Sequence, residues 1–383
     1  MKKVAIISEF NPFHNGHKLL FDRVRDFFAP EEVCLVCIMS GNFVERGTLA
    51  VMSKYKRAEI AADMGADLVL ELPFPYSASY AQSFARASVH IANALGDIEY
   101  LAFGSESNDG ENILDCADKL SGKEFDDALR EMLKESKNTS EPYASVRSRA
   151  FKELYGNELP SKPNDILAIE YLLAIKTFNS NIKPLFVRRD KDFSASESRG
   201  YIYSCDDTLA RVIPESVYEK TASAEKFPPH LPDATLILFL SNTDVIDIAN
   251  SPEMNFDLAS RLVNAAKSGK YKTVKALFSA VATKKYTDAR IRRALNFAFL
   301  DINKKDLEAM PEYTNLLASS EAGRKALRTF SKTSKINILA TKSAHNKLSG
   351  LAAEQYTLSE KADRAFYFLS NENGTENKPY IKK

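Results

Sequence analysis

The first hundred residues alternate short apolar runs with longer amphipathic stretches, and this alternation constrains the fold more than any other feature. The runs favour β-strands because they are short and rich in Val, Ile and Leu, whereas the stretches between them repeat apolar residues at helical spacing. The predicted strands cover Val4–Ile7, Val33–Met39, Ala66–Leu72, Tyr100–Phe103 and, further on, Ile182–Val187. This order predicts an α/β fold with a Rossmann-like, doubly wound parallel sheet that binds ligands at the carboxyl ends of its strands.

The second half of the chain has a different pattern. Ser223–Pro232 is punctuated by prolines and is typical of a linker. Beyond it, Phe256–Lys267, Thr273–Ala282 and Asp288–Phe299 carry apolar residues three or four positions apart, which predicts helices. We therefore expect two domains, with the sheet in residues 1–220 and a mostly α-helical C-terminal domain in residues 221–383.

Composition limits the function classes only weakly. The chain has 52 Lys and Arg against 51 Asp and Glu, so its total charge does not by itself indicate a nucleic-acid partner. It has no apolar signal segment after a basic start and no run long enough to span a bilayer, which predicts a cytoplasmic protein without a membrane partner. Cys34 and Cys37 lie in an apolar predicted strand, so we expect them to be buried rather than to serve redox or metal chemistry.

The strongest chemical signal is the segment Phe-Asn-Pro-Phe-His-Asn-Gly-His, residues 10–17, between the first predicted strand and the first predicted helix. When a nucleophile attacks the α-phosphorus of ATP, negative charge grows on the phosphoryl oxygens, and His14 and His17 can donate hydrogen bonds to them. Gly16 lets the backbone approach a phosphate closely, and the following helix offers N–H groups and a positive dipole end. The segment predicts ATP-dependent adenylyl transfer with His14 and His17 as catalytic residues.

The same histidine pair is also compatible with a structural role or with metal binding. The two imidazoles could merely pack against or cap a turn, or they could bind zinc. Zinc usually needs three or four protein ligands, and the sequence contains no convincing further cluster, so no protein metal site is predicted.

A second polar segment, Ser194–Arg199, follows the last predicted strand and reads Ser-Ala-Ser-Glu-Ser-Arg. Without further context, serines before a basic residue most often form a helix N-cap beside a solvated charge. The residues alone leave open whether Ser194 and Arg199 serve in this way or bind a ligand.

These segments together resemble the HxGH nucleotidyltransferase superfamily and, more closely, the tRNA(Met) cytidine acetate ligase family. The resemblance extends over Glu9–His17, Ser40–Phe43, Lys54–Glu59, Gly65–Pro73, Phe103–Glu106 and Pro163–Tyr171. It implies that ATP is bound by Ile7, Phe10, Asn11, Pro12, Gly16, Leu20, Gly104, Asn164 and one of Arg188 and Arg189, with the triphosphate held at Ser194 and Arg199.

The resemblance also implies a two-step reaction. Acetate attacks ATP to give acetyl-adenylate and pyrophosphate, and the exocyclic amine of the wobble cytidine of elongator tRNA(Met) then takes the acetyl group, forming N4-acetylcytidine. Mg²⁺ is expected to accompany ATP, because this ion commonly bridges phosphates while using few protein ligands. No segment marks the acetate pocket, and no protein partner is predicted.

An RNA substrate requires a basic surface, and residues 267–293 offer one. Nine Lys or Arg residues lie there with Asp288 as the only acid, and Tyr271 and Tyr286 stand between them. Phosphate neutralisation and base stacking use these residue types. The predicted RNA-binding residues are Lys284, Lys285, Arg290, Arg292 and Arg293. A solvated basic helix face, with no ligand, is the alternative.

Two competing functions remain at this level. One is a small-molecule adenylyltransferase of the same superfamily that uses no RNA, against which the basic C-terminal segment argues. The other is a non-catalytic RNA-binding protein with a relic nucleotide pocket, against which the presence of His14, Gly16, His17 and Arg199 argues.

Overall fold

The computed structural model describes residues 1–136, 141–188, 194–370 and 378–382. Its centre is a sheet whose strand order is β5-β4-β1-β2-β3-β6-β7, with β8 also paired to β6. The strands are β1 (Lys2–Ser8), β2 (Val33–Ser40), β3 (Leu68–Leu72), β4 (Tyr100–Ser105), β5 (Lys183–Arg188), β6 (Tyr313–Ser319), β7 (Asn337–Leu339) and β8 (Tyr380–Ile381). All pairs are parallel except β3 with β6, which confirms the predicted mostly parallel α/β fold.

Helices follow the strands and continue into the second half of the chain. Those up to residue 223 are α1 (Asn15–Phe28), α2 (Lys54–Asp63), α3 (Ala81–Ala94), α4 (Gly110–Leu120), α5 (Lys123–Ser136), α6 (Tyr143–Tyr155), α7 (Pro163–Thr177), α8 (Ala195–Ser204), α9 (Leu209–Val212) and α10 (Glu215–Ser223). The later ones are α11 (Asp233–Asn242), α12 (Val245–Ala249), α13 (Phe256–Lys267), α14 (Val274–Val281), α15 (Asp288–Phe299), α16 (Glu321–Thr333) and α17 (Gly350–Tyr367).

Both faces of the sheet are buried, which explains why its strands are continuous apolar runs. Along β2, Cys34 and Val36 face one hydrophobic core with α3, α4, α7 and α16, whereas Leu35 and Cys37 face another with α1, α2, α8 and α10. Cys34 and Cys37 are free, buried thiols, as predicted, and burial raises the pKa of Cys34 to about 12. They therefore stay protonated and act as small apolar side chains.

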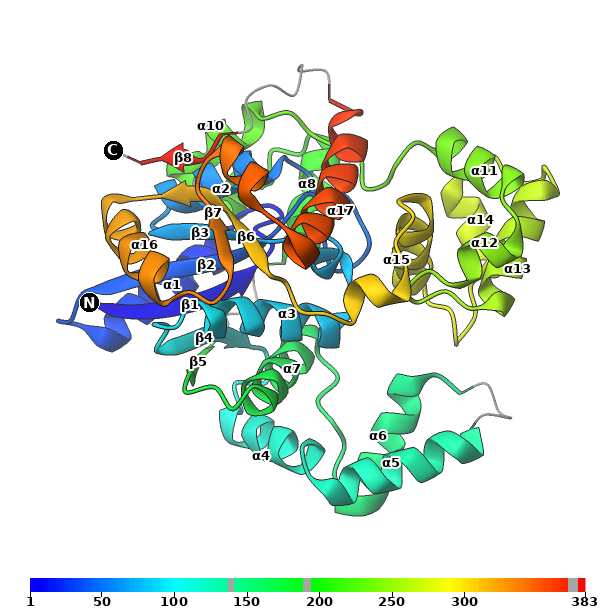
Figure 1. Cartoon of the computed structure of the whole chain (residues 1–383), viewed down its shortest axis with the longest axis horizontal. Helices are drawn as coiled ribbons and strands as arrows, with labels where there is room; N and C mark the ends of the chain where they lie inside the picture. The colour runs from blue at the N-terminus through cyan, green and yellow to red at the C-terminus, as the bar shows by residue number, and fades with distance from the viewer. Residues whose placement is uncertain (137–140, 189–193, 371–377, 383) are drawn as a thin grey trace.

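The second half of the chain forms a third core and then returns to the sheet. Figure 1 shows α11–α14 gathered at one end of the molecule, with α15 between them and the sheet. Only helices were predicted after residue 232, yet β6, β7 and β8 extend the sheet beyond β3. Short apolar runs such as residues 313–319 do not distinguish strand from helix by periodicity, and β6 is stabilised by pairing with β3, far away in sequence.

The predicted linker is packed against the rest of the protein. Phe227 is buried and its ring stacks on Phe366 of α17, with 3.9 Å between the ring centroids. Its backbone N–H donates to Val51, and the carbonyl of Pro229 accepts from Leu49. The domain boundary near residue 220 stays a prediction. Within the described ranges, no helix is long and apolar enough to cross a membrane.

Candidate active site

The two histidines of the first loop form a hydrogen-bonded cap at the start of α1. His14 is the N-cap residue, and its Nδ1 accepts from the backbone N–H of Gly16 at 3.1 Å. His17, three residues later, accepts the backbone N–H of His14 on its own Nδ1 at 3.2 Å. The two rings stack with their centroids 3.8 Å apart, so the loop holds both imidazoles in one fixed arrangement.

This arrangement sets the proton position on each ring. A neutral imidazole carries one proton, and a nitrogen that accepts a hydrogen bond does not hold it. Because Nδ1 is the acceptor in both His14 and His17, the neutral rings carry their protons on Nε2. Phe10 and Phe13 pack against the ring of His17 and help to orient it. Both imidazoles therefore lie at the positive amino end of α1, a position that suits an anionic ligand.

The cap geometry also bears on the zinc alternative. One nitrogen of each ring is already engaged with the backbone. Among the residues that the structure describes, no group of three or more His, Cys, Asp or Glu side chains is placed to hold a metal ion.

Asn11 and Arg199 connect the histidine loop to α8. Arg199 Nη1 donates to the backbone carbonyl of Asn11 at 2.8 Å, and the Asn11 side chain accepts the backbone N–H of Val51, also at 2.8 Å. Asn11 is buried, and its Nδ2 has no hydrogen-bond partner in the described structure. Burial lowers the pKa of Arg199, which nonetheless stays cationic at neutral pH. A buried donor and a guanidinium thus lie next to the two imidazoles.

The end of β4 and the start of α7 meet at the same edge of the sheet. β4 pairs directly with β1, so Gly104 lies at the strand end neighbouring the histidine loop. The backbone N–H of Asn164, in the first turn of α7, donates to Glu106 at 3.2 Å. The buried Asp165 carboxylate accepts from Ser105 and from the backbone of Glu106, both at 2.9 Å. These contacts bring Gly104 and Asn164 together, and Asp165 is a positioning residue that the sequence did not single out.

The remaining predicted ATP-binding residues occupy the surrounding segments. Ile7 is in β1, Pro12 is buried in the loop, Leu20 is in α1, Arg188 ends β5, and Ser194 is the N-cap of α8. Ser194 Oγ accepts the backbone N–H of Glu197, so it serves as a cap. Arg188 is exposed, and its carbonyl accepts from Arg23 of α1. Arg189 lies outside the described residues.

A buried arginine is hydrogen-bonded to the ends of two neighbouring strands, next to the histidine loop. Arg57 of α2 is fully buried, and its guanidinium donates to the backbone carbonyls of Glu9, Ser40, Gly41 and Met52. Burial lowers its pKa to about 10, which still leaves it charged at neutral pH. Arg57 thereby joins the carboxyl ends of β1 and β2. Lys54–Glu59 was part of the family resemblance, but nothing in that pattern predicted a buried arginine.

Two acidic residues, Glu9 and Glu45, are neighbours close to Arg57. The backbone N–H of Glu45 donates to Glu9 Oε1 at 2.9 Å, and Glu9 immediately precedes the histidine loop. Burial, reinforced by the neighbouring Glu9 carboxylate, raises the pKa of Glu45 to about 7. The positive charges of Arg293 and Arg46 act in the opposite direction but are weaker. Glu45 is therefore protonated in part at neutral pH.

The raised pKa of Glu45 predicts a specific pH dependence of the free energy of unfolding. Its ordinary pKa of 4.5 applies to the unfolded chain, so between about pH 4.5 and 7 the folded protein binds more protons than the unfolded one. Stability supplied by the neutral carboxyl group is thus present at low pH and is lost as the pH rises through about 7. We expect Glu45→Gln to be more stable than the wild type at pH 8 by about 2 kcal/mol and equal to it near pH 5.

Urea unfolding at both pH values checks this expectation. Glu131→Gln, at an exposed position of α5, serves as the control and should change neither value. An equal stability difference between Glu45→Gln and the wild type at pH 5 and pH 8 would contradict the raised pKa.

The predicted RNA-binding residues lie at and just before α15 but differ in exposure. Lys284 is exposed, and Lys285, Arg290 and Arg292 are half-buried. Arg293 is buried and forms an ion pair with Glu253, with Nη2 to Oε2 at 2.7 Å. We therefore assign Arg293 a structural role.

The tyrosine expected to stack on RNA bases next to these residues is also buried. The Tyr286 hydroxyl donates to Asp257 at 2.9 Å, and its ring is covered by Lys285 and Arg290. The prediction of a stacking role for Tyr286 is corrected by this burial.

α15 is attached to the loop that follows β2. Arg292 Nε donates to the carbonyl of Arg46 at 3.1 Å, and Asn296 Nδ2 donates to that of Gly47 at 2.9 Å. Gly47 has a φ of +69°, and a Cβ there would lie 2.6 Å from the backbone nitrogen of Arg293, so only glycine fits. The basic helix therefore contacts the same loop that carries Glu45.

The chain is similar to known proteins over most of its length. A family model described as HIGH Nucleotidyl Transferase matches residues 1–379. The tRNA(Met) cytidine acetate ligase of Acetivibrio thermocellus is 30% identical over 370 residues, covering 88% of each chain. That of Streptococcus pneumoniae serotype 2 is 33% identical over 341 residues, covering 86% of this chain and 87% of the relative. The crystal structure of Thermotoga maritima TmcAL bound with alpha-thio ATP superposes with a TM-score of 0.90 at 28% identity, covering 100% of this chain and 99% of that one.

Proposed function

Because this chain belongs to the tRNA(Met) cytidine acetate ligase family, within the HIGH nucleotidyl transferases, we propose that it uses ATP to acetylate the wobble cytidine of elongator tRNA(Met). The product is N4-acetylcytidine. The observation that carries the proposal is the paired cap of His14 and His17, in which both Nδ1 atoms accept backbone N–H groups and both rings lie at the start of α1. The Thermotoga maritima relative with an ATP analogue bound supports ATP as the substrate.

In the first step, an oxygen of acetate attacks the α-phosphorus of ATP, and the bond from that phosphorus to the pyrophosphate oxygen breaks. Charge builds up on the phosphoryl oxygens during this attack. The Nε2–H groups of His14 and His17 and the amino end of α1 stabilise that charge without forming a covalent intermediate. Arg199, next to Asn11, neutralises the departing pyrophosphate.

In the second step, the exocyclic amine of cytidine attacks the carbonyl carbon of acetyl-adenylate. The new N–C bond forms, the bond from carbon to the phosphate oxygen breaks, and AMP leaves. An aromatic amine is a weak nucleophile, so the mixed anhydride supplies the leaving group that a free carboxylate lacks. The amine loses one proton in the process, and this proton passes to water.

The ATP-binding set that we propose surrounds this centre. It comprises Ile7, Phe10, Asn11, Pro12, Gly16, Leu20, Gly104, Asn164, Ser194, Arg199 and one of Arg188 and Arg189. The unpartnered Nδ2 of Asn11 is a donor that a bound nucleotide can satisfy. Mg²⁺ bound together with ATP would supply positive charge to the phosphates, and no protein carboxylate is assigned to it.

For the RNA, we propose that residues 221–383 supply the docking surface, with Lys284, Lys285, Arg290 and Arg292 as phosphate contacts. The double variant Lys284→Glu/Lys285→Glu is expected to weaken tRNA binding about tenfold at low salt and to reduce its salt dependence. Acetate-dependent ATP–pyrophosphate exchange should be unchanged, because neither lysine belongs to the proposed ATP-binding set.

The matched control is Lys332→Glu/Lys335→Glu, two exposed lysines at the end of α16 and just after it. In Figure 1, α16 lies at the left of the molecule, well away from α15. Equal losses of tRNA affinity in both double variants would indicate a general charge effect and would contradict the proposed surface.

The proposed function is tested by transfer of labelled acetate into purified elongator tRNA(Met), with ATP present or omitted. Label in the RNA only when ATP is present is the expected result. Acetate-independent ATP turnover without any labelled RNA would instead support the small-molecule adenylyltransferase.

A further inference from the structure

A pocket of about 320 Å³ lies between α2, β6, β7 and α17, apart from the histidine loop. Its lining includes Tyr55, Asn315, His345, Tyr356, Glu360 and Asp363. None of the proposed ATP-binding residues within the described ranges is among the lining side chains. The pocket is therefore a second candidate site, formed largely by the segment that returns to the sheet after residue 313.

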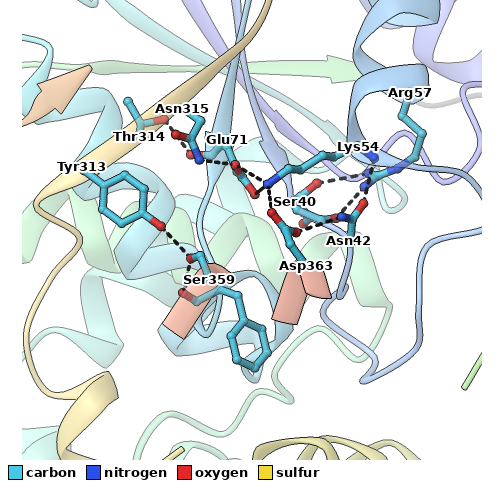
Figure 2. Close-up of polar contacts among 12 residues, drawn as sticks. Ser40, Asn42, Lys54, Arg57, Glu71, Tyr313, Thr314, Asn315, Ser359 and Asp363 are labelled. Carbon is cyan, nitrogen blue, oxygen red and sulfur yellow. Dashed lines mark hydrogen bonds and ion pairs between the residues drawn. The ribbon is translucent and has the colours of Figure 1, made fainter. Parts of the chain in front are cut away.

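One wall of this pocket is a buried ionic cluster, drawn in Figure 2. Lys54 Nζ contacts Glu71 Oε1 at 2.8 Å and Asp363 Oδ2 at 2.6 Å. Asn42 donates to the other Asp363 oxygen at 2.9 Å, and Asn315 donates to Glu71 at 2.7 Å. The side chains of Lys54 and Glu71 are each 2% exposed, whereas that of Asp363 is 27% exposed. Asp363 is thus the most exposed of the three charged side chains in the cluster.

The pocket is lined by two acidic and two basic side chains, Asp363 and Glu360 against Lys54 and Arg364. Lys54 already donates to its two carboxylate partners, Glu71 and Asp363, so it has little capacity for a further ligand. Each oxygen of Asp363 accepts a hydrogen bond within the cluster and has the capacity to accept a second, so the pocket suits a hydrogen-bond donor.

The other walls are aromatic. Tyr55, Tyr356, Tyr367 and His345 all line the space. The rings of His345 and Tyr356 are parallel within 3°, with their centroids 4.9 Å apart. A further flat ring can stack on parallel aromatic rings of this kind. A planar ligand bearing an amino group matches both the aromatic and the acidic walls.

We propose that this pocket binds an unpaired nucleobase of the RNA substrate, one that carries an exocyclic amino group, namely cytosine or adenine. The proposal rests on the proposed function, since it takes the ligand to be tRNA. Carboxylates accept hydrogen bonds from such amino groups, and unpaired RNA bases stack on aromatic side chains. Because the pocket is apart from the ATP-binding residues, the bound base is a neighbour of the acetylated cytidine and holds the RNA in register.

The test uses fluorescence anisotropy of a labelled anticodon stem-loop RNA from elongator tRNA(Met). Tyr356→Ala is expected to raise the Kd about tenfold, because it removes a stacking ring. Tyr356→Phe keeps the ring and should bind like the wild type. Glu360→Gln should raise the Kd several-fold, whereas Glu354→Gln, at an exposed position of the same helix, should leave it unchanged. Thermal melting of each variant identifies any loss of folding.

Unchanged RNA affinity in both Tyr356→Ala and Glu360→Gln would overturn the proposal. If Tyr356→Ala lowers the melting temperature, unchanged affinity in Glu360→Gln is sufficient to overturn it. Free cytidine is tested as a competitor in the same assay, because adenosine would also bind at the proposed ATP site. Cytidine that binds the wild type but not Glu360→Gln, and that does not displace the RNA, would place a small molecule in the pocket and would also overturn the proposal. Failure of the wild type to incorporate acetate into tRNA would remove the proposed function separately, because anisotropy measures binding without catalysis.

Discussion

His17→Gln is expected to fold like the wild type and to form the proposed acetyl-adenylate about 100- to 1,000-fold more slowly. The side chain of His17 has two separable tasks. Its Nδ1 accepts the backbone N–H of His14, which completes the cap of α1, and its Nε2–H is the proposed donor to the α-phosphate. Glutamine at this third helical position is a natural capping-box residue, so it can replace the first task while lacking the imidazole.

Comparison with His17→Ala separates the two tasks. Alanine removes both the cap and the donor, so it should match the activity loss of His17→Gln and also lower stability by about 1 kcal/mol. Acetate-dependent ATP–pyrophosphate exchange measures the activity, and urea unfolding measures the stability. If His17→Gln catalyses this exchange at a rate near that of the wild type, His17 is not a catalytic donor. A fall in activity that tracked the fall in stability would point to a structural role for His17.

Lys54→Met is expected to destabilise the folded protein by about 3–5 kcal/mol. Methionine fills a similar volume but leaves Glu71 and Asp363 without their shared cation. A domain of ordinary stability, about 5–15 kcal/mol, would lose a large share of it. The Glu71 carboxyl is buried, and its pKa is already raised by that burial, so without Lys54 it takes up a proton as the pH falls. The destabilisation should accordingly be larger at pH 8 than at pH 5.

Lys56→Met on the same helix is the matched control. Lys56 pairs with Glu59 at 2.7 Å, but its side chain is 36% exposed, so water replaces the lost partner. Its removal should cost less than about 1 kcal/mol. Denaturant unfolding of both variants checks the contrast, and comparable costs for Lys54→Met and Lys56→Met would show that the buried cluster does not depend on its lysine.

The local sequence was sufficient for the elements that build the histidine loop. The apolar runs around Val4 and Val33 and the helix after His17 were all predicted, because strand and helix periodicities are properties of a few consecutive residues. The placement of His14, Gly16 and Gly104 at neighbouring strand ends followed from the same pattern, since parallel strands end at one edge of the sheet. Cys34 and Cys37 were predicted to be buried for the same reason.

Contacts in the candidate site could be predicted from the sequence only where both partners lie in one short segment. The cap that joins His14 and His17 spans three residues, so the motif implies it. The contact of Arg199 with Asn11 spans 188 residues, and the family resemblance indicated the residue but not its partner. The basic segment before α15 was visible as composition, yet the burial of Arg293 and Tyr286 depends on Glu253 and Asp257, which only the folded helices bring near.

The sequence by itself determined the strand–loop–helix order, the α/β class and the family, because these rest on local periodicity and on contiguous motifs. The tertiary structure alone decided that residues 313–381 return to extend the sheet and that Lys54, Glu71 and Asp363 meet in one cluster. Lysine and aspartate in amphipathic helices are ordinarily solvent-exposed, so no local pattern distinguishes this buried pair, whose members lie 309 positions apart. Its formation requires α17 to pack beside β6, and that packing is stabilised by contacts between segments distant in the chain.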